Sequence, residues 1–261
     1  MDKATDNLSE QRQIVYDALG RFAKKRAEWY RDKKAINLKG LLSKDIVMFA
    51  SRGVATADEF VIEAFHAKES TSEETVMGTL RQEICAAVSA DTLDTGDMTT
   101  LRDGDLYVCE LKSQKNTVNS SSFPQELREL RDKCETLERF RRASRQKVLP
   151  AFCVMRSDKR IDEWREFTPN HRDQANRDLA GFRYRYLAGS GFWRWIIGLD
   201  SIDNLIEDFG LINLGDVRQA REECIRRLKS EMSEALDKEG LGHSMNDVLE
   251  LRRRLFNQRS K

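Results

Sequence analysis

Apolar residues in the first third of the chain recur at intervals of three and four positions. This spacing places them on one face of an α-helix, so we predict helices over most of residues 7–90. The segment TADE (Thr56–Glu59) marks a helix start, because its threonine and glutamate have the spacing of a capping box. The apolar stripes are Ile14, Val15, Ala18, Leu19, Phe22 and Trp29 near the start, and Met77, Leu80, Ile84, Ala87 and Val88 near the end.

The pattern changes after residue 90, where short apolar segments alternate with turns. The segments DMTTL (97–101) and LYVCELK (106–112) flank RDGD, and its Asp-Gly pair favours a tight turn, so we predict a β-hairpin. The continuous apolar segment Val148–Met155 is typical of a strand in the middle of a sheet. Residues Phe182–Gly189 alternate aromatic and arginine side chains, as a strand with one polar face does.

The remaining segments predict helices. A long helix is expected to open at Ser122–Gln125, with Pro124 in its first turn. One α/β domain with helical ends is the simplest account of these elements. The other expected helical segments are residues 192–197, a segment from 202 that ends at Gly210, and two that begin near Asp216 and Ser244.

Composition is that of a globular protein, with 39% hydrophobic and 34% charged residues. The formal net charge of +1 gives no overall basic bias toward nucleic acid, although Arg139–Lys147 and Leu251–Lys261 contain no acidic residue. No apolar run reaches the length of a membrane helix, and the first ten residues are too polar for a signal peptide. The five cysteines form no CxxC pair, which indicates reduced, buried thiols and a cytoplasmic protein.

Glu110 and Lys112 stand two residues apart at the end of a predicted strand. Because side chains alternate across a strand, these two share one face, and the apolar residues around them face the core. The alternative is an exposed edge strand whose glutamate and lysine are solvated, and spacing alone does not decide between them. The residues expected on the core side are Tyr107, Cys109 and Leu111.

The hairpin can also fold Asp97 back beside Glu110. Two adjacent carboxylates repel each other unless a cation lies between them. Mg²⁺ fits such a site, because it prefers oxygen ligands and keeps several waters. A neighbouring lysine can orient a water or stabilise developing negative charge, so the set Asp97, Glu110 and Lys112 suits hydrolysis of a phosphodiester.

These motifs together resemble the PD-(D/E)xK nucleases, specifically the type II restriction endonucleases. The likeness rests on GD…LRDGDLYVCELK, followed by NTVNSS and a helix. The later segment YLAGSGFWRWIIG is similar to a strand–turn–helix of such enzymes. The proline that precedes the first aspartate in that family is absent, since Gly96 precedes Asp97 here, and Asp94 therefore stays open as the upstream acid.

The resemblance implies an α/β fold with a central mixed β-sheet of about five strands flanked by helices, restriction-endonuclease-like. It covers residues 75–200, which we take as the catalytic core of a single nuclease domain, 1–261. The segments 1–74 and 201–261 would then be helical N- and C-terminal regions.

The resemblance also implies the site. Asp97, Glu110 and the backbone carbonyl of Leu111 would bind Mg²⁺, and Lys112 would act on the attacking water. Glu83 would be an auxiliary acid, or otherwise an ordinary exposed helix residue. The polar side chains after Lys112 would contact DNA, because Asn and Gln can read adenine edges while Ser, Thr and Lys hold phosphates. They are Ser113, Gln114, Lys115, Asn116, Thr117 and Asn119.

The expected activity is Mg²⁺-dependent, sequence-specific cleavage of double-stranded DNA in the cytoplasm of a bacterium or archaeon. A palindromic target would require a C₂ homodimer, and a cognate DNA methyltransferase is expected in the same system. Two alternatives stay open at this point. One is a repair or structure-specific nuclease with the same core, and the other is a non-catalytic DNA-binding or interaction protein.

Overall fold

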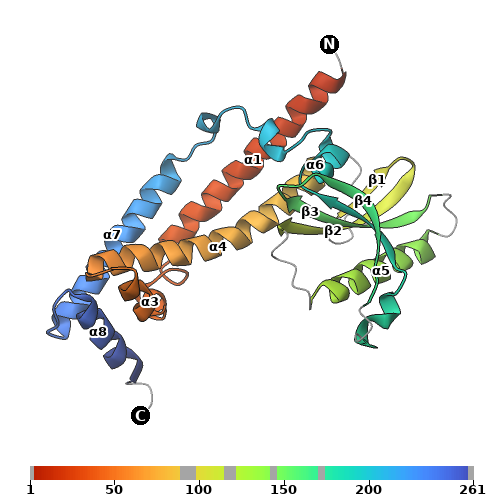
Figure 1. The fold of residues 1–261 in the computed structure, drawn as a ribbon. Coiled ribbons are helices and arrows are strands. Elements are labelled where there is room, and N and C mark those ends of the chain that lie inside the picture. The colour runs from red at the N-terminus through yellow and green to blue at the C-terminus, as the bar shows by residue number, and fades with distance from the viewer. Residues whose placement is uncertain (1–2, 89–97, 115–121, 142–145, 170–173, 258–261) are drawn as a thin grey trace. The chain divides into compact units, whose positions relative to one another are not determined.

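Helices form both ends of the chain and strands form its middle, as a computed structural model of the protein shows (Figure 1). The structure describes residues 3–88, 98–114, 122–141, 146–169 and 174–257. The helices are α1 (Lys3–Arg31), α2 (Leu38–Leu42), α3 (Ile46–Ser51), α4 (Ala57–Val88), α5 (Phe123–Phe140), α6 (Ser190–Ile197), α7 (Gly215–Lys238) and α8 (Met245–Asn257). The strands are β1 (Met98–Arg102), β2 (Asp105–Gln114), β3 (Val148–Arg156), β4 (Ile161–Glu166) and β5 (Arg183–Ala188).

The strands form one five-stranded mixed sheet in the order β1-β2-β3-β5-β4. Strands β2, β3 and β5 run parallel, whereas β1 and β4 run antiparallel to their neighbours at the two edges. Helices flank this sheet, so the predicted α/β architecture is confirmed. Strand β4 was not predicted, because four of the six residues in IDEWRE are charged and the strand is mostly exposed at an edge.

The predicted hairpin is confirmed, and its turn consists of two residues. Arg102 pairs with Asp105, which leaves Asp103 and Gly104 as the loop. Both have positive φ angles, 54° and 85°, as a type I′ turn requires. The turn fixes the register, which places Met98 opposite Cys109.

The middle of the sheet is buried on both faces. On one face, α5 packs Leu130 and Cys134 against Val108 and Val148. On the other face, the ring of Tyr107 lies 5.1 Å from that of Trp195 on α6. Trp193 Nε1 donates a 2.9 Å hydrogen bond to the carbonyl of Met155, and Cys85 on α4 lies 3.5 Å from the Met155 sulfur. Burial on both sides explains the continuous apolar sequence of β3.

The turn from β5 into α6 depends on two glycines. Gly189 has a φ angle of 53°, and a Cβ there would lie 2.5 Å from the carbonyl oxygen of Ser157. A Cβ on Gly191 would clash with the backbone of Ile161. The strand–turn–helix expected from YLAGSGFWRWIIG is therefore present, and larger residues do not fit at these positions.

The prediction of one continuous helix from residue 202 to Gly210 is wrong. The chain forms two short 3-10 helices, η3 (Ile202–Leu205) and η4 (Phe209–Leu211). Ser201 and Asn204 cap η3 in a capping box, and Ile206 then adopts extended backbone angles, which ends the helix. A third 3-10 helix, η2 (Gln174–Leu179), precedes β5.

The chain divides into two compact units. The first comprises Met1–Ala18 and Gly78–Phe209 and contains the whole sheet. The second comprises Leu19–Met77 and Gly210–Lys261 and has its own apolar core. Helices α1 and α4 each contribute residues to both units, so the prediction of a single nuclease domain stays a prediction.

A partly buried charge cluster lies in the second unit. The guanidinium of Arg221 on α7 donates two hydrogen bonds to Glu69 on α4, at 2.7 and 2.9 Å. The Tyr30 hydroxyl donates a further bond of 2.6 Å to Glu69. Burial disfavours the charged carboxylate, but these donors outweigh it and lower the pKa of Glu69.

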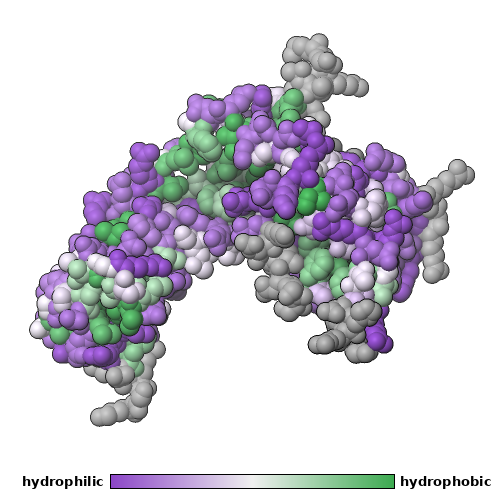
Figure 2. All heavy atoms as spheres, in the orientation of Figure 1, coloured by the Kyte–Doolittle hydropathy of each residue, from purple (hydrophilic) through white to green (hydrophobic). Residues whose placement is uncertain are grey.

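Hydrophilic residues cover most of the face seen in Figure 2, as a content of 34% charged residues leads one to expect. All five cysteines are buried and free of disulfides, as predicted. None of the described helices combines the length and the apolar character that a bilayer crossing requires.

Candidate active site

Glu110 and Lys112 lie on the face of β2 that α5 covers. Val108 precedes them on the same face and packs against Leu130 and Cys134. Strand β2 lies between β1 and β3, and only 7% of Glu110 is exposed. The alternative of an exposed edge strand with solvated charges is therefore wrong. As expected, Tyr107, Cys109 and Leu111 are buried, with exposed fractions of 6%, 1% and 2%.

A compact charge cluster surrounds Glu110. Lys112 Nζ lies 2.9 Å from Glu110 Oε1 and 3.1 Å from Oε1 of Glu126, a residue in the first turn of α5. Lys133, further along α5, approaches the second oxygen of Glu110 at 3.4 Å. Two carboxylates and two ammonium groups thus lie together between β2 and α5. Partial burial there strengthens each electrostatic interaction.

Lys112 is a positively charged hydrogen-bond donor in this arrangement. Burial disfavours its charged form, but hydrogen bonds to Glu110 and Glu126 outweigh that effect and raise the pKa of Lys112. One ammonium group therefore holds two carboxylates that would otherwise repel each other.

Glu126 has a carboxylate oxygen without a partner. Its Oε2 is buried and makes no hydrogen bond within the described part of the chain. Leaving a buried acceptor unsatisfied costs about 1–3 kcal/mol, and such groups in folded proteins often serve binding or catalysis. Sequence reasoning missed Glu126, although a signal exists. It lies three residues after Phe123 and four before Leu130, on the buried side of α5.

Comparison with known protein families adds a second observation. Residues 9–211 match the model of the type II restriction endonuclease EcoO109I family, a range that includes the entire sheet, α5 and α6. The chain belongs to this family. This match supports a restriction endonuclease of the PD-(D/E)xK type, and Glu110-x-Lys112 stays the predicted (D/E)xK element. A comparison with curated proteins gave no match.

The upstream acid of this family member stays a prediction. Asp97 and Asp94 both lie outside the described residues. The described strand β1 begins at Met98, whose pairing partner Cys109 directly precedes Glu110.

Two further predicted site residues involve α4: Leu111 contacts this helix, and Glu83 belongs to it. The carbonyl of Leu111 accepts a 3.3 Å hydrogen bond from Gln82 Nε2. Glu83, the next residue of α4, is exposed and makes no hydrogen bond or ion pair with the described residues. Its predicted role as an auxiliary acid therefore gains no geometric support here.

Of the predicted DNA-contacting residues, Ser113 and Gln114 end β2 and are half-buried. Gln114 pairs in register with Arg156 of β3 and lines a pocket at that end of the sheet. The remaining four, Lys115, Asn116, Thr117 and Asn119, lie outside the described residues.

The donor set of the site fits a hard divalent cation. Glu110 and Glu126 supply carboxylate oxygens, which are the ligands that Mg²⁺ prefers. Glu126 Oε2, which makes no hydrogen bond within the described residues, could coordinate such an ion. Within the described ranges, no group of three or more His, Cys, Asp or Glu side chains is placed to hold a metal.

Proposed function

We propose that the protein is a Mg²⁺-dependent, sequence-specific endonuclease that hydrolyses phosphodiester bonds of double-stranded DNA. The observation that carries this proposal is the buried cluster of Glu110, Lys112 and Glu126 in a chain of the EcoO109I family. Burying charged groups lowers the free energy of unfolding unless they are well paired. Clusters of this kind occur at catalytic sites, so a hydrolytic site accounts for their presence.

Glu110, Asp97 and the Leu111 carbonyl would hold the metal ion, and Glu126 has a free oxygen to join them. When bound, a divalent ion lowers the pKa of a coordinated water and neutralises negative charge on a phosphate oxygen. The protein's own contribution is to keep the carboxylates close together on β2 and α5 and to exclude bulk water from one side of them.

Lys112 would orient the attacking water and stabilise the negative charge that develops on the phosphate. Its ammonium has three donors, of which Glu110 and Glu126 take two. The third would donate to a water or a phosphate oxygen. A preorganised positive donor stabilises developing negative charge more strongly in such a site than in bulk water.

DNA would lie across the end of β2. Ser113, Gln114 and the segment with Lys115, Asn116, Thr117 and Asn119 follow Lys112 directly, so their side chains would contact the bases and phosphates around the cleaved bond. A palindromic site would be cut by a C₂ homodimer, and a cognate methyltransferase would protect the host DNA.

A digest of DNA of known sequence tests the proposal. Purified protein is incubated with plasmid and with a viral genome, with and without Mg²⁺. Discrete fragments that appear only with Mg²⁺ are the expected result. Nicking confined to branched or damaged substrates would instead indicate a repair nuclease. Binding without any cleavage, by protein shown to be folded, would indicate a non-catalytic DNA-binding protein.

A further inference from the structure

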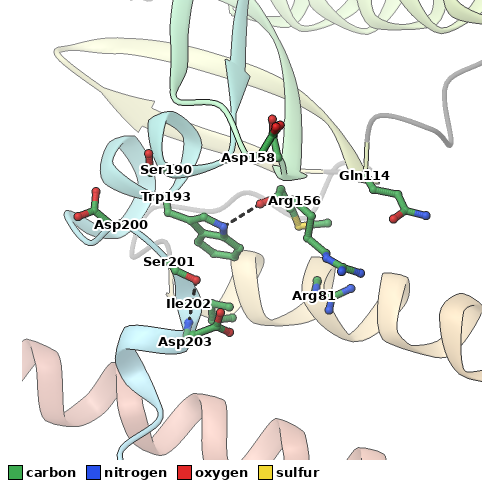
Figure 3. Close-up of a pocket in the computed structure, with 13 residues that line it drawn as sticks. Arg81, Gln114, Arg156, Asp158, Ser190, Trp193, Asp200, Ser201, Ile202 and Asp203 are labelled. Carbon is green, nitrogen blue, oxygen red and sulfur yellow. Dashed lines mark hydrogen bonds between the residues drawn. The ribbon is translucent and has the colours of Figure 1, made fainter.

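A pocket of about 720 Å³ opens at the carboxyl ends of β2 and β3 (Figure 3). Gln114 contributes from the end of β2, Arg156 from the end of β3 and Arg81 from α4. Trp193 of α6 forms another part of the lining. Gln114 lies two residues beyond Lys112, or about 6.6 Å along an extended strand. Lys112 faces α5, whereas Met155 and Trp193 line the pocket from the opposite face of the sheet.

Two arginines stand close together at one end of this pocket. Figure 3 shows the guanidinium groups of Arg81 and Arg156 beside each other, near Gln114. Burial, and then the positive charge of Arg156, lower the pKa of Arg81. Within the described residues, neither arginine makes an ion pair with a carboxylate. Like charges held together in this way are stabilised by an anion that both can contact.

The acidic residues of the pocket do not neutralise this pair. Asp200 is occupied by Arg194, which donates to both of its carboxylate oxygens. Asp203 attracts Arg81 electrostatically without forming an ion pair with it. The carboxylate of Asp158 points away from the two guanidinium groups in Figure 3.

We propose that Arg81 and Arg156 bind a backbone phosphate of the nucleic acid where it passes the carboxyl ends of β2 and β3. The planar guanidinium fork matches phosphate oxygens, and contacts of this kind fix the register of a duplex without reading its sequence. The inference rests on the proposed function, because it takes DNA as the substrate. It adds two residues from α4 and β3 to the binding surface.

Equilibrium binding of a fluorescent DNA duplex at several salt concentrations, without Mg²⁺, tests this site. Arg81→Gln and Arg156→Gln are each expected to weaken binding several-fold, whatever the duplex sequence. Loss of this phosphate contact in the double variant Arg81→Gln/Arg156→Gln should also make the slope of log K against log salt shallower by about 1. Arg81→Lys and Arg156→Lys keep the positive charge, so the salt dependence of binding should stay close to that of the wild type. Arg218→Gln, which removes an exposed arginine on α7, should change neither quantity.

The result that would overturn the proposal is a folded Arg81→Gln/Arg156→Gln protein with wild-type affinity and salt slope. The same titrations with inorganic phosphate and with a nucleoside monophosphate identify the source of the phosphate. Arginine-dependent binding of a free nucleotide, with duplex binding unchanged, would also contradict a backbone contact. If wild-type protein neither binds nor cleaves DNA, the proposed function itself fails. If the wild type does both and the variants match it, only this inference fails.

Discussion

Glu126 on α5 and Lys112 on β2 are joined by a contact of 3.1 Å between Oε1 and Nζ. This contact makes the helix that follows the hairpin part of the candidate active site. The same lysine holds Glu110 at 2.9 Å, so two carboxylates from different elements lie within reach of one ammonium group. Helix α5 therefore positions an acid as well as covering the sheet.

Glu126→Gln is expected to weaken metal binding. The amide keeps the shape of the side chain and can still accept from Lys112, but it removes the charge that attracts a divalent cation. We expect the affinity of the DNA-bound protein for Mn²⁺ to fall at least about 10-fold, and cleavage to need correspondingly more metal. Titration calorimetry with Mn²⁺ measures the first effect without relying on activity.

The matched control for this variant is Glu129→Gln, which changes an exposed glutamate on the same helix. Wild-type Mn²⁺ affinity in Glu126→Gln would remove Glu126 from the metal site. It would leave that residue as a partner of Lys112 only.

Lys112→Ala is expected to reduce DNA cleavage at least about 100-fold, because it removes the positive donor that we propose stabilises charge on the cleaved phosphate. It also leaves Glu110 and Glu126 facing each other, so thermal unfolding must show that the variant is folded at the assay temperature. Lys34→Ala is the control, since Asp32-x-Lys34 has similar spacing but an exposed lysine. Cleavage by Lys112→Ala at the wild-type rate would show that the site is wrong.

Local signals in the sequence were sufficient for much of the fold. The Asp103–Gly104 pair specifies a two-residue turn on its own, and this turn sets the register of the hairpin. Pro124 marks the first turn of α5, and the apolar run Val148–Met155 matches a strand buried on both faces. Each of these features depends on residues that are close together in the chain.

Features that depend on distant residues were not predicted. Glu126 reaches Lys112 only because α5 packs across β2, and nothing in FPQELREL specifies that packing. Strand β4 forms by pairing with β5, although IDEWRE has little apolar character. The burial of Glu110 likewise follows from the packing of α5 across β2, which brings Lys133 to its carboxylate.

Asp97→Asn is expected to abolish cleavage, whereas Asp94→Asn is expected to retain it. Met98 is paired with Cys109, the neighbour of Glu110, and Asp97 is the residue directly before Met98 in the sequence. Asp94 stands three residues further away along the chain. Plasmid cleavage and Mn²⁺ binding should be measured for both variants. An inactive Asp94→Asn beside an active Asp97→Asn would reverse the assignment of the upstream acid.

Glu69→Gln is expected to destabilise the protein at neutral pH by about 2 kcal/mol, a typical value for lost hydrogen bonds to a charged group. Arg221 and Tyr30 lower the pKa of Glu69 from its ordinary value of 4.5, so the charged carboxylate stabilises the fold above that value. This stability is lost as the pH falls below 4.5 through the lowered pKa of the folded state. Urea unfolding followed by circular dichroism should therefore show wild type and Glu69→Gln converging in acid. Glu74→Gln, at an exposed position of α4, is the control and should follow the wild-type pH dependence. A difference in unfolding free energy between wild type and Glu69→Gln that stays constant at every pH would contradict the role of the Glu69 charge.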